Sequence, residues 1–281
     1  MTPPDRDDSE LTTERIDPSF YLSSRTDAFL YACHLATYDF ASRHVEGKRV
    51  LDFGCGIGYG THRIAPRCAS IVGVDVSEDA IAAASRRFES PGLSYQRIQP
   101  AERAPLPFED GAFDVVLSFQ VFEHLTDPDA YLQEVRRVLA PAGLFICVTP
   151  ERGPRLFPWQ RPWNEFHVEE YSQEQLASHL RRFFPSVEVA GMSARPELLE
   201  LEMARVRKLK WTTVPFTFPK APERLRVRGL QWLKKLQGSR KVVGAGSATR
   251  SLEDWDLGPD DIDVFTKDTP SFNVVCLARP A

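Results

Sequence analysis

The stretch that decides the fold is Val50-Leu51-Asp52-Phe53-Gly54-Cys55-Gly56-Ile57-Gly58-Tyr59-Gly60. Its apolar first half predicts a buried strand, and its second half predicts a glycine-rich turn that leads into a helix over residues 61–65. Glycine adopts positive φ angles readily and has no Cβ atom to hold a ligand away from the backbone. The spacing differs from the dinucleotide pattern G-x-G-x-x-G, which would require glycine in place of Tyr59. The stretch predicts either a cradle for a nucleoside-containing ligand or a tight turn in another kind of α/β protein.

Asp52 gives this turn a charge preference. A carboxylate at its mouth would repel a pyrophosphate, but it suits a ligand that carries an ammonium group and no phosphate. S-adenosylmethionine is such a ligand. The stretch resembles the nucleoside-binding loop of the class I S-adenosylmethionine-dependent methyltransferases, whose pattern is acid-x-G-x-G-x-G. This resemblance implies cofactor contacts from Asp52, Gly54, Cys55, Gly56 and Gly58.

Length and composition limit the class of protein. With 281 residues, 42% of them hydrophobic, the chain can bury one α/β core and an appendage. The formal net charge of −4 argues against a protein that coats nucleic acid. The five cysteines are widely spaced without a C-x-x-C pair, so we expect reduced core residues in a cytoplasmic protein. The sequence shows no signal-peptide pattern and no apolar run of about 20 residues.

Predicted strands and helices alternate along the chain. We expect strands over residues 48–53, 70–75, 93–98, 113–119, 144–148, 187–192 and 272–277, and helices over residues 27–44, 77–88, 127–139 and 172–184. This alternation predicts an α/β fold with a Rossmann-like, doubly wound, mostly parallel sheet of seven strands and helices on both faces. In such sheets the ligand binds at the carboxyl ends of the strands.

The chain divides into three predicted regions. Residues 1–14 are polar and predict a disordered tail. Residues 15–193 together with residues 266–281 predict the S-adenosylmethionine-binding methyltransferase domain. Residues 194–265 predict a basic, partly helical insertion, or cap, before the last strand.

Asp75 ends the second predicted strand. A carboxylate at this place can accept hydrogen bonds from both ribose hydroxyls of a nucleoside held over the glycine turn. Because NAD enzymes use the same device, an NAD(P)-binding oxidoreductase is one alternative, although Asp52 and the interrupted glycine pattern disfavour it. With Asp52, Asp75 favours S-adenosylmethionine, and Val76 would then lie against the adenine.

Three later segments make the resemblance more specific. Residues 106–114 resemble the methyltransferase segment L-P-F-x-D-x-x-F-D, residues 121–125 its E-H-L strand tip, and residues 134–139 its E-x-x-R-V-L helix. The resemblance implies further cofactor contacts from Ala101, Glu102 and Phe119, although many relatives have aspartate where Pro100 stands. The fourth strand lacks the Asn/Asp-Pro-Pro-Tyr element of enzymes that methylate nucleic-acid bases, so we expect no nucleic-acid partner.

A narrower resemblance concerns the acceptor. Residues 34–41 and the segment Asn164-x-x-His167-x-x-Glu170-Tyr171 resemble parts of methyltransferases in bacterial cell-surface glycan biosynthesis. Such relatives often have arginine where Thr37 stands. The resemblance implies that the acceptor is bound by Tyr38, Asn164, Glu170 and Tyr171.

Two histidines are candidates for the general base. Methyl transfer to a hydroxyl requires alignment of the acceptor and removal of its proton, and histidine titrates in the useful pH range. We expect His167 to be the base, with His124 the next candidate and Glu123 orienting a histidine or binding the acceptor. The alternative is that each histidine only holds a loop in place. No metal-ligand motif is present, so we expect no catalytic metal.

The segment over residues 205–241 is strongly basic. It contains twelve Lys and Arg residues and one acid, Glu223. We expect amphipathic helices over residues 197–210 and 221–236. The second helix would turn inward Leu225, Leu230, Leu233 and Leu236. The segment suits an anionic acceptor, such as a phosphate- or lipid-linked sugar, or peripheral contact with a membrane surface. The alternative is a solvated outer face.

Together these features predict a methyltransferase that uses S-adenosylmethionine and releases S-adenosylhomocysteine. We expect O-methylation of a saccharide or another small polar acceptor by in-line transfer. The alternatives are methylation of a protein or natural product, an NAD(P)-binding oxidoreductase, and a non-catalytic binding protein with the methyltransferase fold.

Overall fold

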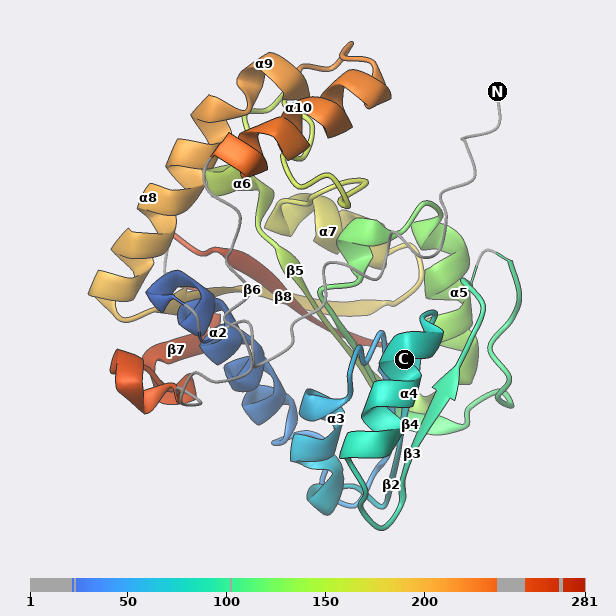
Figure 1. Cartoon of the computed structure of the whole chain (residues 1–281). Coiled ribbons are helices and arrows are strands. Elements are labelled where there is room, and N and C mark those ends of the chain that lie inside the picture. The colour runs from blue at the N-terminus through green and yellow to red at the C-terminus, as the bar shows by residue number, and fades with distance from the viewer. Residues whose placement is uncertain (1–21, 23, 102, 237–250, 268–269, 281) are drawn as a thin grey trace.

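A single eight-stranded sheet lies at the centre of the described chain (Figure 1). The computed structural model describes residues 22, 24–101, 103–236, 251–267 and 270–280. The strands are β1 (Arg49–Phe53), β2 (Ser70–Asp75), β3 (Leu93–Arg97), β4 (Phe113–Phe119), β5 (Leu139–Pro150), β6 (Ser186–Ala194), β7 (Ile262–Thr266) and β8 (Asn273–Arg279). Their order across the sheet is β3-β2-β1-β4-β5-β8-β6-β7. The first five strands are parallel, and β8 runs antiparallel to β5 and β6.

The predicted α/β class and doubly wound, mostly parallel sheet are confirmed, with one correction to the strand count. The sequence predicts seven strands, whereas the described residues form eight. The extra strand, β7, comes from the end of the predicted insertion and pairs antiparallel with β6, for example Ile262 with Ala194. β7 is only five residues long and follows Pro259-Asp260-Asp261, which reads as a loop, so its alternation is too short to recognise.

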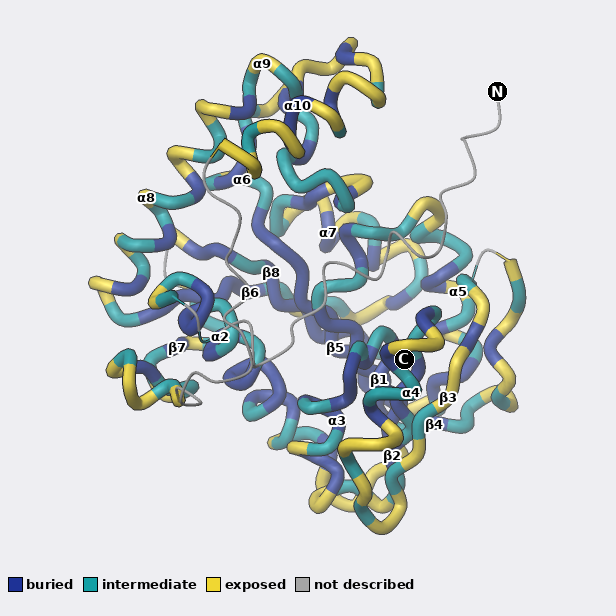
Figure 2. The backbone as a smooth tube through the Cα atoms, viewed as in Figure 1, coloured by how far each residue is buried: buried dark blue, intermediate teal, exposed yellow. Residues whose placement is uncertain are grey.

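Helices cover both faces of the sheet. They are α2 (Arg25–Ala41), α3 (Tyr59–Ile64), α4 (Glu78–Arg87), α5 (Pro128–Val138) and α7 (Gln173–Leu180). The apolar core on one face includes residues of α2 and α3, and the core on the other face includes residues of α5 and α7. Figure 2 shows the central strands as the most continuously buried part of the described chain, whereas the edge strand β3 is largely exposed. The predicted tail, residues 1–14, lies outside the described residues.

Side-chain caps fix the start of several helices. The Ser77 hydroxyl accepts a hydrogen bond from the backbone N–H of Ala80 at the start of α4. Ser172 and Gln175 form a reciprocal capping box at the start of α7. Such caps satisfy N–H groups that have no partner within the helix. The helix starts therefore follow from local sequence.

The insertion forms a helical cap beyond the carboxyl end of β5 (Figure 1). Its helices are α8 (Pro196–Thr212), α9 (Val214–Thr217) and α10 (Glu223–Leu236). α8 packs on α6 (Arg152–Arg155), which follows β5 directly. The two helices predicted in this region are confirmed, and their ends differ from the prediction by two residues at most.

The predicted inward face of α10 is partly wrong. Leu230 is buried as expected, but Leu225 and Leu236 are exposed. The reason is the close approach of α9 at Gly229, where an added Cβ would lie 2.1 Å from Cδ1 of Phe216. Packing at this glycine turns the neighbouring Arg226 inward, so the leucine pattern alone could not identify the buried face.

Arg226 attaches the cap to the rest of the molecule. Its guanidinium is almost completely buried and pairs with Glu223 at 2.7 Å. It also donates hydrogen bonds of 2.9 to 3.1 Å to the backbone carbonyls of Pro162, Asn164 and Glu165. Burial opposes ionisation of Glu223, but Arg226 and Arg161 outweigh this effect and lower the pKa of Glu223 to about 2. This charged cluster therefore holds the loop at residues 162–165 against α10.

We predict that Arg226→Ala destabilises the protein strongly. The change leaves three carbonyls without their donor and removes a buried partner of Glu223, so the free energy of unfolding should fall by about 3 kcal/mol or more. The control is Arg224→Ala, because Arg224 is exposed on the same helix. Denaturant unfolding measures both variants. Equal stability of the two would contradict the anchoring role of Arg226.

Candidate active site

A cavity of about 250 Å³ opens at the carboxyl ends of β1, β2 and β4. The strand order reverses between β1 and β4, so this is the topological switch point where doubly wound sheets bind ligands. Residues singled out in the sequence line much of its wall, namely Tyr38, Gly54, Cys55, Gly56, Asp75, Val76, Ala101, Phe119 and His124. The fold thus brings together most of the predicted cofactor residues. Glu102 lies outside the described residues.

The glycine turn leaves space where side chains would otherwise stand. Gly54 and Gly56 have φ angles of +93° and +55°, which disfavour other residues. A Cβ added at Gly54 would lie 2.3 Å from Cγ2 of Val121, whereas one added at Gly56 meets no atom within 4 Å. Gly58 caps the start of α3 and is not part of the cavity wall. The turn therefore offers a backbone cradle at Gly56.

Asp75 is held in place by the same turn. Its carboxylate accepts hydrogen bonds from the backbone N–H groups of Gly56, at 3.0 Å, and Ser77, at 2.9 Å. These bonds fix the orientation of the carboxylate, which lines the cavity next to Val76. The carboxylate has further lone pairs for hydroxyl donors, and the ribose contact stays a prediction.

Asp52 is buried and, unlike its neighbours Phe53 and Gly54, is not part of the cavity wall. Its Oδ2 accepts hydrogen bonds from the hydroxyls of Tyr38, at 3.0 Å, and Thr61, at 2.6 Å. Its Oδ1 has no hydrogen-bond partner among the described residues. Burial raises the pKa of Asp52 to about 6, although both hydroxyl hydrogen bonds oppose this rise. A buried acceptor of this kind fits a ligand that carries a positive charge.

His124 faces the cavity from the tip of β4. It ends the short helical turn η3 (Phe122–His124), which follows Gln120 in the left-handed region with φ of +57°. Nδ1 of His124 lies 3.1 Å from the carbonyl oxygen of Phe166. Because a carbonyl only accepts, this contact places the proton on Nδ1 and the lone pair on Nε2.

His167 is buried beside His124 but does not line the cavity. Its Nδ1 lies 2.7 Å from Oε1 of Glu170, and its Nε2 lies 2.8 Å from Nδ2 of Asn164. The N–H of Phe166 donates to Oδ1 of Asn164, which orients the amide so that its nitrogen donates to His167. Both ring nitrogens of His167 therefore have structural hydrogen bonds.

Most of the other residues predicted to bind the acceptor lie outside the cavity wall and contact the residues around His167 and η3. Glu170 is completely buried and binds Arg155 through two hydrogen bonds of 2.7 and 3.0 Å. Burial would raise its pKa, but Arg155 and His167 together lower the pKa of Glu170 to about 2. Tyr171 packs edge-on against Phe122. Asn164, Glu170 and Tyr171 are not part of the cavity wall, whereas Tyr38 is.

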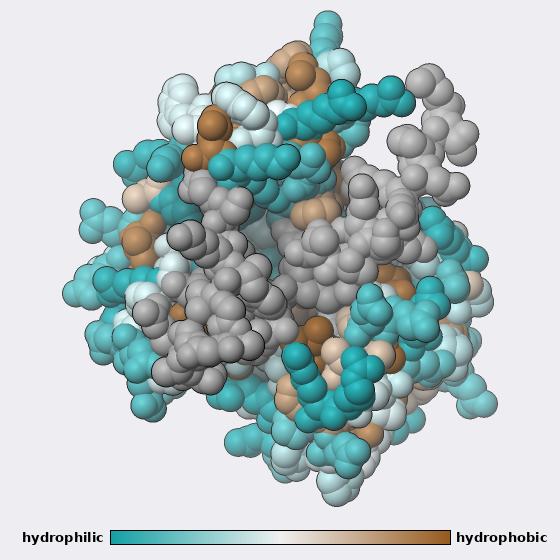
Figure 3. Space-filling model, in the orientation of Figure 1, coloured by the Kyte–Doolittle hydropathy of each residue, from teal (hydrophilic) through white to brown (hydrophobic). Residues whose placement is uncertain are grey.

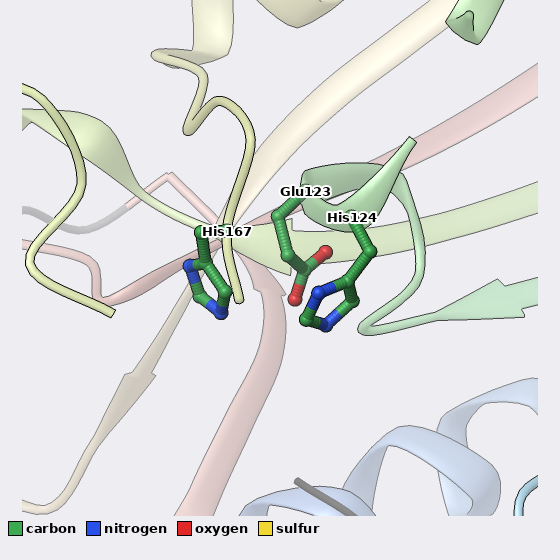
Figure 4. Close-up of side chains that lie close together, drawn as sticks. All are labelled: Glu123, His124 and His167. Atoms are coloured by element: carbon green, nitrogen blue, oxygen red, sulfur yellow. The ribbon is translucent and has the colours of Figure 1, made fainter. Parts of the chain in front are cut away.

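Glu123 completes a small cluster with the two histidines. It is buried, and its carboxylate accepts a 2.8 Å hydrogen bond from Thr149. Glu123, His124 and His167 each offer a potential metal-ligand atom, and these atoms lie within 4.8 Å of one another (Figure 4). Sequence reasoning found no metal motif here, because His167 reaches the cluster only through the fold.

His34 is a cavity residue that sequence reasoning did not assign to the site. It lies one helical turn before Tyr38 on α2, so both side chains reach the same wall. Burial lowers the pKa of His34 to about 4, so its imidazole is neutral at physiological pH. In the sequence, only its spacing of four residues from Tyr38 indicates that His34 lies on the same face of the helix.

The geometry agrees with comparisons to known proteins. Residues 51–147 match the family model of a methyltransferase domain. The "Probable S-adenosylmethionine-dependent methyltransferase MT3114" of Mycobacterium tuberculosis (strain CDC 1551 / Oshkosh) is 31% identical over 193 residues, covering 68% of this chain and 67% of that protein. The chain belongs to the S-adenosylmethionine-dependent methyltransferases. It is an enzyme, as the sequence predicts.

Two further similarities concern a shorter segment and the fold. A "Ubiquinone biosynthesis O-methyltransferase" of Cereibacter sphaeroides (strain ATCC 17029 / ATH 2.4.9) is 39% identical over 112 residues, covering 40% of this chain and 45% of that protein. The crystal structure of the [4+2]-cyclase SpnF superposes with a TM-score of 0.52 at 19% identity, covering 87% of this chain and 80% of that chain. This second similarity concerns the fold alone.

S-adenosylmethionine is therefore the cofactor of this methyltransferase, and the cavity fits it. The Asp52 carboxylate, which is buried behind the cavity residue Tyr38, suits its positive charge by attraction through the wall, and the open space at Gly56 suits close backbone contact. Asp75 and Val76 line the part of the cavity wall where we expect the nucleoside to bind. Among the described residues, no helix is long and apolar enough to cross a membrane.

We predict that the methyltransferase binds S-adenosylmethionine more tightly as the pH rises from 5 to 7. The Asp52 carboxyl has a pKa of about 6 without ligand, and only its ionised form attracts the cation. Affinity should fall up to tenfold per unit of pH below 6. In Asp52→Asn the affinity should be low and nearly independent of pH over this range.

Isothermal titration at several pH values measures this dependence. The control is Asp39→Asn, because Asp39 is a half-buried acid of α2 that pairs with Arg63 outside the cavity. It should keep the wild-type pH response. An unchanged response in Asp52→Asn would show that Asp52 does not sense the cofactor.

Proposed function

We propose that this methyltransferase methylates a hydroxyl oxygen of a saccharide or another small polar acceptor, with His124 as the general base. One observation carries the proposal. The His124 imidazole lines the same cavity as the glycine turn, and its Nδ1 is held by the Phe166 carbonyl so that Nε2 carries the lone pair. A base in this tautomer next to the cofactor site is what transfer to a hydroxyl requires.

The proposal reverses the order in which the sequence ranks the two histidines. His167 donates to Glu170 and accepts from Asn164, so taking up a second proton would break the contact with Asn164. His124 differs in that its ring lines the cavity, and its contact with the Phe166 carbonyl makes Nε2 the unprotonated nitrogen. His167 thus serves to hold the 164–170 segment, and through Phe166 it helps to orient His124.

The remaining residues support proton removal and alignment. When bound, S-adenosylmethionine supplies a methyl group activated by a sulfonium. His124 accepts the acceptor's proton at Nε2, and the buried Glu123 carboxylate stabilises the resulting imidazolium by opposite charge. Tyr38 and Phe119 form an edge-to-face pair with ring centroids 5.0 Å apart, which gives the cavity a rigid apolar wall. Rigid walls favour the aligned geometry that the displacement needs.

Two further features favour a polar hydroxyl acceptor. Neutral His34 and the side chain of Gln120 add hydrogen-bonding groups to an otherwise largely apolar wall. One relative is named an O-methyltransferase, and residues 34–41 and 164–171 resemble enzymes of glycan biosynthesis. These points support oxygen as the methylated atom and a saccharide as the acceptor class.

We predict that His124→Ala lowers turnover by roughly 10²–10⁴-fold and changes the affinity for S-adenosylhomocysteine little, because proton removal is lost and the cofactor cradle remains. Added imidazole should restore part of the activity. His124→Asn can still donate to the Phe166 carbonyl, because its amide nitrogen takes the place of Nδ1, but it has no base, so it should be equally inactive and melt like the wild type. An active His124→Asn enzyme would contradict the proposed base.

The metal-ligand cluster allows a separate prediction. If His124 acts as a simple base, dialysis against EDTA should leave turnover unchanged, and added Mg²⁺, Mn²⁺ or Zn²⁺ should not increase it. Loss of activity on chelation, restored by one of these ions, would instead assign Glu123, His124 and His167 to a cation. Calorimetry of S-adenosylhomocysteine binding before and after chelation checks that the cofactor site is intact.

The acceptor class can be tested directly. Labelled methyl transfer into a host extract, followed by separate glycosidase, protease and nuclease digestion, shows which treatment releases the label. We expect release by glycosidase. Release by protease would reassign the acceptor to a protein.

A further inference from the structure

The outer surface of α10 is apolar where a helix of a globular protein is normally polar. Leu225, Trp232 and Leu236 are 46%, 55% and 63% exposed. At about 100° per residue, these positions lie within roughly 40° of one another on the helix. The buried side of the same helix contains Arg226, Gly229 and Leu230. α10 therefore presents a continuous apolar stripe to solvent while it buries an arginine.

Basic side chains flank this stripe on one side. Arg224, Arg228 and Lys235 are exposed and lie next to it on the helix surface. The acid of α10, Glu223, is bound to Arg226 and Arg161. The exposed side of the helix is therefore positively charged along its whole length.

Other parts of the cap also have exposed aromatic residues. Trp211, at the end of α8, and Phe218, after α9, are 64% and 37% exposed. The Trp232 ring lies edge-on over Phe216 of α9, with ring centroids 6.4 Å apart. Figure 3 shows apolar residues over α9 and α10 beside long hydrophilic side chains. The cap thus combines exposed tryptophans and leucines with basic side chains on one part of the molecule.

We propose that this cap surface, formed on α10 by Leu225, Arg228, Trp232, Lys235 and Leu236, docks on an anionic lipid bilayer. Interfacial helices combine Trp, Phe and Leu on the membrane side with flanking Lys and Arg that contact anionic headgroups. Tryptophan prefers the boundary between headgroups and acyl chains. A second copy of the chain is disfavoured as the occupant, because a twofold contact would place Arg228 and Lys235 against the same charges.

Docking would place the active site next to the bilayer. The buried side of α10 binds the loop at residues 162–165 through Arg226, and Lys234 pairs with Glu165 at 2.6 Å. The next residue, Phe166, lines the cavity and holds His124 through its carbonyl. One helix therefore separates the proposed lipid contact from the rim of the cavity. The docking proposal does not depend on which atom or acceptor is methylated.

Vesicle flotation with the full-length protein tests this proposal. The probes are vesicles of phosphatidylcholine alone and vesicles with one quarter phosphatidylglycerol. We expect binding to the anionic vesicles, weakened by salt, and little binding to the neutral ones. With anionic vesicles, part of the tryptophan fluorescence should become protected from a soluble quencher. The Trp232→Phe variant should lack this protection, which would assign the protected signal to Trp232.

Two variants separate the basic and apolar contributions. Arg228→Glu with Lys235→Glu should lower the partition onto anionic vesicles at least tenfold, and Leu225→Ser with Leu236→Ser should do the same. The matched control is Arg43→Glu with Arg86→Glu, because both arginines are exposed outside the cap. All variants should keep the wild-type affinity for S-adenosylhomocysteine, since none of these residues lines the cavity.

The proposal is wrong if the wild type does not float with either vesicle, or if the cap and control variants lose binding equally. Capture of the wild type by a soluble anionic polysaccharide but not by vesicles would also overturn it and would assign the cap surface to glycans. Equal melting temperatures of the cap and control variants exclude unfolding as the cause of lost binding.

Discussion

The site depends on one buried carboxylate at the end of β1. Asp52 is 1% exposed and accepts hydrogen bonds from Tyr38 on α2 and Thr61 on α3, so it joins both helices to the strand beneath the glycine turn. Burying a charged group without full compensation is costly, and the raised pKa of Asp52 expresses that cost. A cation held in the adjoining cavity would lower this cost by electrostatic attraction. The buried Asp52 carboxylate therefore favours a positively charged cofactor.

A second chain of contacts connects the cap to the proposed base. Arg226 on α10 holds the carbonyls of the 162–165 loop, Asn164 in that loop binds His167, and the Phe166 carbonyl orients His124. Each contact is a hydrogen bond between groups that are mostly buried. A change in the position of α10 can therefore alter the position of His124 through this short series of hydrogen bonds. The cap is thus part of the active-site framework, and its outer surface and its inner contacts belong to the same helix.

Much of this arrangement could be predicted from the sequence because it follows from local patterns. The glycine turn, Asp75 at the end of β2 and the E-H-L tip each lie at the carboxyl end of a strand, and parallel strands bring those ends together. The inward face of α10 and the role of His167 could not be predicted. The first depends on the approach of Phe216 to Gly229, and the second depends on Asn164 and Glu170 contacting both ring nitrogens. Neither contact has a signature in residue spacing. His34 shows the intermediate case, in which helical spacing from Tyr38 indicates a shared wall but not its chemistry.

The central claim is transfer of a methyl group to oxygen at a base supplied by His124. The most direct measurement uses the cofactor labelled with ¹³C in its methyl group, incubated with the enzyme and a host extract, and reads the ¹³C chemical shift of the methyl group in the product. The account predicts a methoxy signal with the wild type and none with His124→Asn. A methyl group bound to nitrogen or carbon, or an equal methoxy signal with His124→Asn, would contradict it.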